Sequence, residues 1–214
     1  MNWINKDTEI YCSFAKTAGN TGCQMMNSAF YYYGLNKIYK SFSVDNIKFA
    51  VDSVRILDIK GFAITMPYKV DVLKYVDEVD SGVGEIGASN TVINNNGILK
   101  AYNTDYLAAK QILKDYKDTK LYILGDGGYA KTVKSATISL GIRFEVISRK
   151  QNNWDEIKDI KDSVIYNCTP VENINTDESN KFIDCIVTTI TGKKLANIQA
   201  SHQFKLYTNL EWPL

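Results

Sequence analysis

A glycine-rich segment at residues 125–130 has the residue types and the spacing of a phosphate-binding loop. Its sequence, GDGGYA, fits the pattern G-x-G-x-x-A and lies between an apolar run at 121–124 and a helix-like segment near 128–140. Glycine lets the backbone turn tightly and approach a pyrophosphate, which then lies at the N-terminus of the helix. The pattern predicts a dinucleotide site formed by Gly125, Gly127, Gly128 and Ala130; the alternative is a tight turn that binds no ligand.

The charged residues near this loop indicate which dinucleotide to expect. Ser148, Arg149 and Lys150 follow a strand-like segment at 144–147, where an NAD site usually offers Asp or Glu. Because an arginine there suits a 2′-phosphate, we expect NADP as the cofactor, with Ser148 and Arg149 in contact with it. Alternatively, Arg149 is a solvated loop cation. Asp126 acts against binding, since its carboxylate would repel phosphates in the loop.

The composition excludes several other classes of protein. The chain has 214 residues, 45% of them hydrophobic, and its 25 basic and 24 acidic residues leave a net charge of +1. This balance argues against nucleic acid or an anionic membrane as the main partner. Four scattered cysteines and one histidine do not suggest a metal site, and we expect reduced thiols. Without a signal-peptide pattern or a long apolar run, the sequence predicts a cytoplasmic protein.

Strand-like and helix-like segments alternate along the chain, which favours an α/β fold with mainly parallel sheets. Asp45 is expected to open a helix, and Pro67 to stand in the first turn of a helix over 67–76. The Asn94–Gly97 stretch predicts a hairpin between strands 91–93 and 98–102. The other expected strands are 38–44, 121–124, 144–147, 164–166 and 182–187, and the other helices begin at Asp105 and near 128, 152 and 193.

Six motifs occur in the order in which the shikimate dehydrogenase family carries them, and together they make the chain resemble that family. They are FAITMPYK at 62–69, IGASNTV at 86–92, YNTD at 102–105, the glycine loop, NCTP at 167–170 and QA at 199–200. Segments 4–8, 18–22 and 190–192 are similar to the shikimate dehydrogenase-like subgroup. One departure is Asn20-Thr21-Gly22, which replaces the S-x-S of the main family at the substrate carboxylate.

The resemblance implies two domains. Residues 1–105 would form an α/β substrate-binding domain on which a C-terminal helix, about 193–214, packs back. Residues 106–192 would form a Rossmann-type dinucleotide-binding domain, reduced because a strand-helix unit before Asn167 and a helix before Ile190 look shortened.

The resemblance also implies an activity and the residues that perform it. The activity is NADP-dependent reduction of 3-dehydroshikimate to shikimate, or a similar reaction of a shikimate- or quinate-like hydroxy acid. Lys69 and Asp105 would be catalytic, Thr169 would bind the cofactor, and substrate would be bound by Asn20, Gly22, Thr65, Asn90 and Gln199.

Each of these assignments has an alternative. Without the family resemblance, Lys69 would be interpreted as an exposed lysine on a helix and Asp105 as the N-cap of a helix. The alternative for the whole chain is a non-catalytic homologue that binds a shikimate-like ligand and has lost effective cofactor binding. The expected partner is a small molecule, without nucleic acid or membrane, and the chain would be a monomer or a homodimer.

Overall fold

A computed structural model describes residues 4–213, which form a mixed α/β structure with two sheets. The chain divides into two compact units. One unit runs to Thr104 and resumes at Ala200, and the other is Asp105–Gln199. Among the described residues, no helix is long and apolar enough to cross a membrane.

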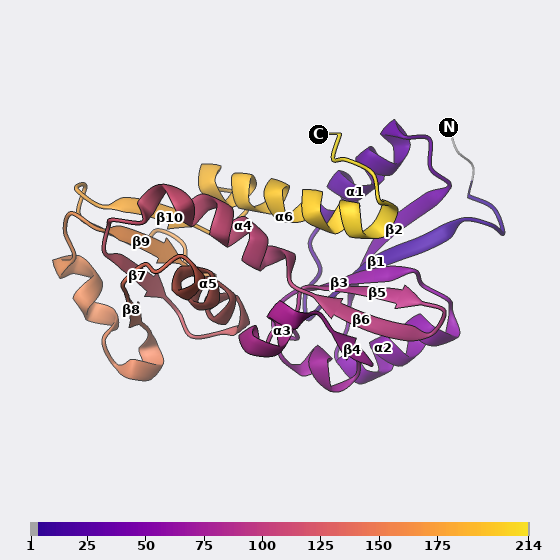
Figure 1. Cartoon of the computed structure of the whole chain (residues 1–214), viewed down its shortest axis with the longest axis horizontal. Helices are drawn as coiled ribbons and strands as arrows, with labels where there is room; N and C mark the ends of the chain where they lie inside the picture. The colour runs from indigo at the N-terminus through magenta and orange to yellow at the C-terminus, as the bar shows by residue number, and fades with distance from the viewer. Residues whose placement is uncertain (1–3, 214) are drawn as a thin grey trace. The chain divides into compact units, whose positions relative to one another are not determined.

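The first unit is built on a six-stranded sheet with the order β2-β1-β3-β5-β6-β4 (Figure 1). Strands β1, β2 and β3 are parallel, whereas β5 pairs antiparallel with β3 and with β6. The turn between β5 and β6 contains Asn96 and Gly97 at positive φ, as the hairpin prediction requires. The strands are Glu9–Ala15 (β1), Lys37–Ser43 (β2), Gly61–Ile64 (β3), Glu78–Val79 (β4), Thr91–Asn95 (β5) and Ile98–Tyr102 (β6).

Helices cover both faces of this sheet, because successive strand residues point to opposite faces. Phe62 and Ile64 of β3 pack in one core with α2 (Ile47–Ile56). Ala63, between them, packs in the other core with α1 (Thr21–Tyr32) and the last residues of α6 (Ile190–Thr208). A short helix, α3 (Ser81–Ile86), precedes β5.

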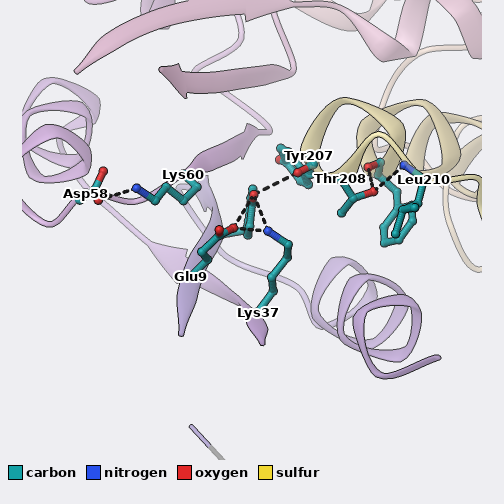
Figure 2. A network of polar contacts seen from close by, with 9 residues as sticks. Glu9, Lys37, Asp58, Lys60, Tyr207, Thr208 and Leu210 are labelled. Carbon is teal, nitrogen blue, oxygen red and sulfur yellow. Dashed lines mark hydrogen bonds and ion pairs between the residues drawn. The ribbon is translucent and has the colours of Figure 1, made fainter. Parts of the chain in front are cut away.

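A polar network fixes the end of α6 at the amino ends of the parallel strands (Figure 2). The hydroxyl of Tyr11 on β1 donates to the carbonyl oxygen of Tyr207 at 3.0 Å and contacts the carboxylate of Glu9 at 3.2 Å. Lys37 on β2 forms an ion pair with the same carboxylate. Partial burial tends to raise the pKa of Glu9, but Lys37 and Tyr11 hold it below its ordinary value. The network therefore ties α6 to β1 and β2.

The second unit has a four-stranded parallel sheet with the order β10-β9-β7-β8 (Figure 1). This order matches the middle of a doubly wound dinucleotide-binding sheet, without its outer strands. One face packs against α4 (Thr104–Leu113), α5 (Gly128–Ser139) and Leu195 of α6. The strands are Leu121–Leu124 (β7), Phe144–Ile147 (β8), Val164–Asn167 (β9) and Lys181–Asp184 (β10).

The connections on the other face are reduced, in line with the shortened segment between 150 and 192 expected from the sequence. Every residue between β8 and β10 is described, and this stretch contains no α-helix. It has only two 3₁₀-helices, η3 (Arg149–Gln151) and η4 (Trp154–Asp159), in place of the single helix expected near 152. Ile157 and Ile160 nevertheless cover Ile165 of β9, so this face also has a small apolar core.

Three sequence predictions about local structure are wrong. Residues 67–76 form a turn and a short 3₁₀-helix, η1 (Asp71–Lys74), because tertiary contacts take the backbone groups that a helix would pair; the Lys69 carbonyl accepts from Ser89 N. The N-cap of α2 is Asn46, whose side chain accepts from Phe49 N, and not Asp45, which pairs with Lys16. Asp105 lies in the first turn of α4 and not at its N-cap.

The packing of α6 on β3 generates the first prediction. A Cβ at Gly61 would lie 2.8 Å from Cε1 of Tyr207 and 3.2 Å from the Val92 carbonyl oxygen. Gly61→Ala therefore overpacks this contact and is expected to lower the free energy of unfolding by about 1–3 kcal/mol, measured by denaturant titration. Gly84→Ala is the control, since a Cβ at Gly84 in α3 meets nothing within 4 Å. Unchanged stability of Gly61→Ala would contradict the packing.

Candidate functional site

The predicted substrate residues of the first unit gather at the carboxyl ends of β1, β2 and β3. The loop after β1 contacts the other two strand ends: Lys16 N donates to the Met66 carbonyl oxygen at 3.2 Å, and Ala18 N donates to Ser43 Oγ at 3.0 Å. Asn20 is exposed at the start of α1, and Gly22 lies in its first turn. Carboxyl ends of parallel strands are where α/β sheets bind ligands.

Thr65, Lys69 and Asn90 are brought together by main-chain hydrogen bonds of their neighbours. Thr65 directly follows β3, and Ile64 N donates to the Asn90 carbonyl oxygen at 2.8 Å. Ser89 N donates to the Lys69 carbonyl oxygen, also at 2.8 Å. Thr65 is exposed and Lys69 is half-buried. Lys69 is therefore not the exposed helix lysine of the alternative interpretation, because it stands in a turn fixed beside Asn90.

The side chain of Asn90 is the centre of a buried polar network. Its Nδ2 donates to Thr104 Oγ1 at 2.9 Å, and its Oδ1 accepts from Thr104 N at 2.8 Å. Thr91 Oγ1 donates to the same oxygen at 3.0 Å and accepts from Gln203 Nε2 at 2.9 Å. Thr91, Thr104 and Gln203 are not among the site residues predicted from the sequence. The first two stand within the ASNT and YNTD motifs, which is the signal that could have found them.

Gln199 lies half-buried on α6, four residues before Gln203. Residues four apart share one face of a helix. Gln199 is therefore on the helix face from which Gln203 reaches Thr91.

Asp105 is buried at the start of the second unit, with 8% of its surface exposed. Two tyrosines of this unit lie within reach of its charge: Tyr129 of α5 and Tyr166 of β9, whose hydroxyls are 2.9 Å apart. Burial raises the pKa of both phenols well above the ordinary value, and the negative charge of Asp105 adds to the shift. Asp105, in the first turn of α4, thus lies near Tyr129 in the first turn of α5 and near Tyr166 on β9.

The glycine loop follows β7 at the carboxyl edge of the second sheet. Gly125 has φ +107°, and a Cβ there would lie 2.8 Å from Cγ2 of Thr169, so glycine is required for conformation and for space. Thr169 is itself held by Asn167, whose Oδ1 accepts from Thr169 N at 2.9 Å. A Cβ at Gly127, in contrast, would meet nothing within 4 Å.

The position of this loop fits a dinucleotide. β7 has β8 on one side and β9 on the other. The order of the strands therefore reverses at β7: the chain first adds β8 on one side and then crosses over to add β9 on the other. Such a switch point, with glycines before a helix N-terminus, is where a pyrophosphate can approach the backbone. Gly128 begins α5, and Ala130 is fully buried against the sheet. The residues present therefore fit the group that the pattern predicts.

Arg149 and Ser148 lie at the end of β8. Arg149 is exposed, and its guanidinium stands 5.3 Å from the centre of the Trp154 ring, a cation–π contact that limits its mobility. Ser148 is buried and caps η3, where its Oγ accepts from Gln151 N. Arg149 is thus held by a neighbour, unlike a free loop cation, whereas Ser148 has a structural partner of its own.

Asp126 is not an unbalanced charge in the loop. Its Oδ1 accepts from Lys134 Nζ at 2.6 Å, and its Oδ2 lies 4.0 Å from Lys150 Nζ. The hydrogen bond from Lys134 is the main reason that the pKa of Asp126 lies below its ordinary value. The structure therefore corrects the expectation of simple repulsion between Asp126 and phosphates. Within residues 4–213, no group of three or more His, Cys, Asp or Glu could hold a metal ion.

Comparison with known proteins gives matches along the chain. Residues 21–92 match the family model described as the shikimate dehydrogenase substrate binding domain. A shikimate dehydrogenase-like protein of Haemophilus influenzae is 39% identical over 136 residues, which is 62% of this chain and 50% of that protein. A shikimate dehydrogenase (NADP(+)) of Halothermothrix orenii is 40% identical over 116 residues, 51% of this chain and 40% of that protein. The matched part thus spans about half or less of these relatives.

The fold is similar over nearly the whole chain. The solved structure of a shikimate 5-dehydrogenase-like protein superposes with a TM-score of 0.82 at 27% identity, covering 98% of this chain and 94% of that one. The family resemblance and the α/β fold class inferred from the sequence are confirmed. The chain is related to the shikimate dehydrogenase family, and its residues 21–92 match that family's substrate binding domain.

Proposed function

We propose that this protein is an NADP-dependent oxidoreductase of the shikimate dehydrogenase type. It would transfer a hydride between the nicotinamide and a ring hydroxyl of a shikimate-like hydroxy acid, reducing 3-dehydroshikimate or a similar ketone. The observation that carries the proposal is that a match to the substrate binding domain at 21–92 stands on the same chain as a glycine loop built for a pyrophosphate. The name of the Halothermothrix orenii relative supports NADP as the cofactor.

The two parts of the chain would divide this work. We assign substrate binding to residues 1–105 and the C-terminal part of α6, where Thr65, Lys69 and Asn90 lie together. We assign the dinucleotide to residues 106–192, where the four parallel strands are followed by Gly125, Ser148, Cys168 and Cys185. Bound NADP would supply the hydride acceptor or donor, and the glycine loop, Arg149 and Thr169 would hold it.

Lys69 and Asp105 are proposed to move the proton that accompanies hydride transfer. Oxidation of a ring carbinol leaves a hydroxyl proton to be removed, and an amine on a flexible stem can both hydrogen-bond the hydroxyl and accept its proton. In this proposal the carboxylate of Asp105 would orient the lysine and a substrate hydroxyl. The buried network of Asn90 holds Thr104, the residue before Asp105, which gives the carboxylate a fixed backbone.

The other predicted residues would recognise the substrate. A polyhydroxylated ring needs several fixed donors and acceptors, and Asn20, Gly22, Thr65, Asn90 and Gln199 offer them. Asn90 and Thr65 are at adjacent strand ends, and Gln199 shares a helix face with Gln203. Asn20 and Gly22 replace the two serines that the main family carries at the substrate carboxylate, so the proposal covers shikimate-like hydroxy acids and does not single out shikimate itself.

A second candidate function is non-catalytic binding of a shikimate-like ligand. It is favoured by the reduced second sheet, which has four strands and no α-helix between β8 and β10 in a stretch that is described throughout. Calorimetry with NADP and with shikimate separately, followed by a spectrophotometric screen of related hydroxy acids, distinguishes the two. Binding of shikimate without binding of NADP would favour the second candidate over the first.

The proposed role of Lys69 predicts a large kinetic effect. Lys69→Ala is expected to lower turnover by about 10²–10⁴-fold, as for loss of a general acid/base, with the melting temperature and NADP affinity close to those of the wild type. Steady-state absorbance of NADPH and calorimetry measure these quantities. Lys74→Ala is the matched control, because Lys74 is an exposed lysine in the same segment. Wild-type turnover in Lys69→Ala would refute the role.

The position of Arg149 predicts cofactor preference. A charge-assisted contact with the 2′-phosphate is worth about 1.5–3 kcal/mol, so the wild type should prefer NADP to NAD by roughly 10–10²-fold. Arg149→Ala should remove most of this preference in kcat/KM. Arg143→Ala, an exposed arginine just before the other end of β8, serves as the control. If the wild type uses NADP and NAD equally well, Arg149 does not recognise the 2′-phosphate.

A further inference from the structure

The side chain of Lys134 forms an ion pair with Asp126, the acidic residue of the glycine loop. Lys134 stands in the second turn of α5, eight residues after Asp126, and both side chains are partly buried, with 23% and 28% of their surfaces exposed. Their Nζ–Oδ1 distance is 2.6 Å. Lys150 is 4.0 Å away and 84% exposed. Lys131 also acts on Asp126 through its charge. Lys134 is thus the better-ordered counter-ion.

Without a counter-ion, Asp126 would oppose the ligand in two ways. Its charge would repel a pyrophosphate, and its oxygens would compete for the backbone N–H groups at the N-terminus of α5, which favour any anion. A unit charge about 5 Å from a phosphate, after screening by solvent, changes affinity on the order of 10-fold. A carboxylate that is already paired with an ammonium group exerts little of either effect.

We propose that Lys134 is a positioning residue for the dinucleotide: it draws the Asp126 carboxylate away from the loop backbone and cancels its charge, so that the glycine loop can receive the pyrophosphate. The inference rests on the proposed binding of NADP. It adds a residue that the G-x-G-x-x-A pattern does not contain. It also explains how an acid is tolerated beside Gly125, at the position where the chain turns into the loop.

The test is a double-mutant cycle on NADP affinity, measured by calorimetry on the full chain. Lys134→Met leaves Asp126 unpaired and should weaken NADP binding about 10-fold. Asp126→Asn should tighten it by roughly 3-fold, since Lys134 is then free to attract phosphate. The double variant Asp126→Asn/Lys134→Met should bind as tightly as the wild type, because Lys134→Met then costs only the roughly 3-fold gained by Asp126→Asn; additive single effects would leave it about 3-fold weaker. Strict additivity of the two single effects would overturn the proposal.

Two controls separate pairing from net charge and from folding. Lys131→Met removes an exposed lysine of the same helix that acts on Asp126 through its charge alone, so Asp126→Asn should rescue it less than it rescues Lys134→Met. Lys134→Arg keeps a cation for Asp126 and should retain wild-type affinity, and thermal unfolding reports whether each variant is folded. Equal rescue of Lys131→Met and Lys134→Met would mean that only net charge matters, and would overturn the specific role of Lys134.

Ligand fragments locate the effect. Lys134→Met should weaken the binding of adenosine diphosphate, which carries a pyrophosphate. It should not weaken the binding of adenosine 2′-monophosphate, which lacks one. The affinity for shikimate should be unchanged. If the wild type binds NADP and Lys134→Met binds it equally well, the inference fails and the proposed function stands. If the wild type binds no NADP, the proposed function fails and the inference fails with it.

Discussion

The hydrogen bonds of Asn90 hold the first unit together at its functional edge. Its carbonyl oxygen accepts from Ile64 N at the end of β3, and its main-chain N–H donates to Tyr102 O at the end of β6. Its side chain binds the main chain and the hydroxyl of Thr104, where α4 begins. Because the amide is 3% exposed, loss of any of these partners would leave a buried polar group unpaired, which is costly. The positions of Thr65 and Lys69 depend on this junction.

The candidate site of each unit is formed in the same way, at the carboxyl edge of parallel strands. Parallel strands end at one edge of a sheet, and short loops that leave this edge place backbone N–H groups and a few polar side chains side by side. In the first unit these loops follow β1, β2 and β3. In the second unit they follow β7, β8 and β9, and the close contact between Gly125 and Thr169 packs two of them together. The reduced connections of the second unit leave this edge intact.

Much of the fold could be predicted from local patterns. The hairpin at β5 and β6 follows from Asn96 and Gly97, because Asn and Gly take the required positive φ easily. The β7–loop–α5 unit follows from an apolar run, glycines and helical periodicity. Strand β1 was not predicted, although it lies between β2 and β3. Its sequence, EIYCSFA, mixes polar and apolar residues, and its burial comes from neighbouring elements and not from its own composition.

The sequence by itself determined the order of the motifs, the α/β class, the glycine pattern at 125–130 and the family resemblance. These depend on residue types and short spacings, which the chain carries whatever its partners. Only the tertiary structure decided that residues 67–76 form a turn and that Asp126 pairs with Lys134. It also decided that the buried Asn90 links β3 to the start of α4 through hydrogen bonds. The physical reason is that a hydrogen bond or an ion pair is set by distance in space, and residues far apart in the chain, such as Thr91 and Gln203, come within bonding distance only after folding.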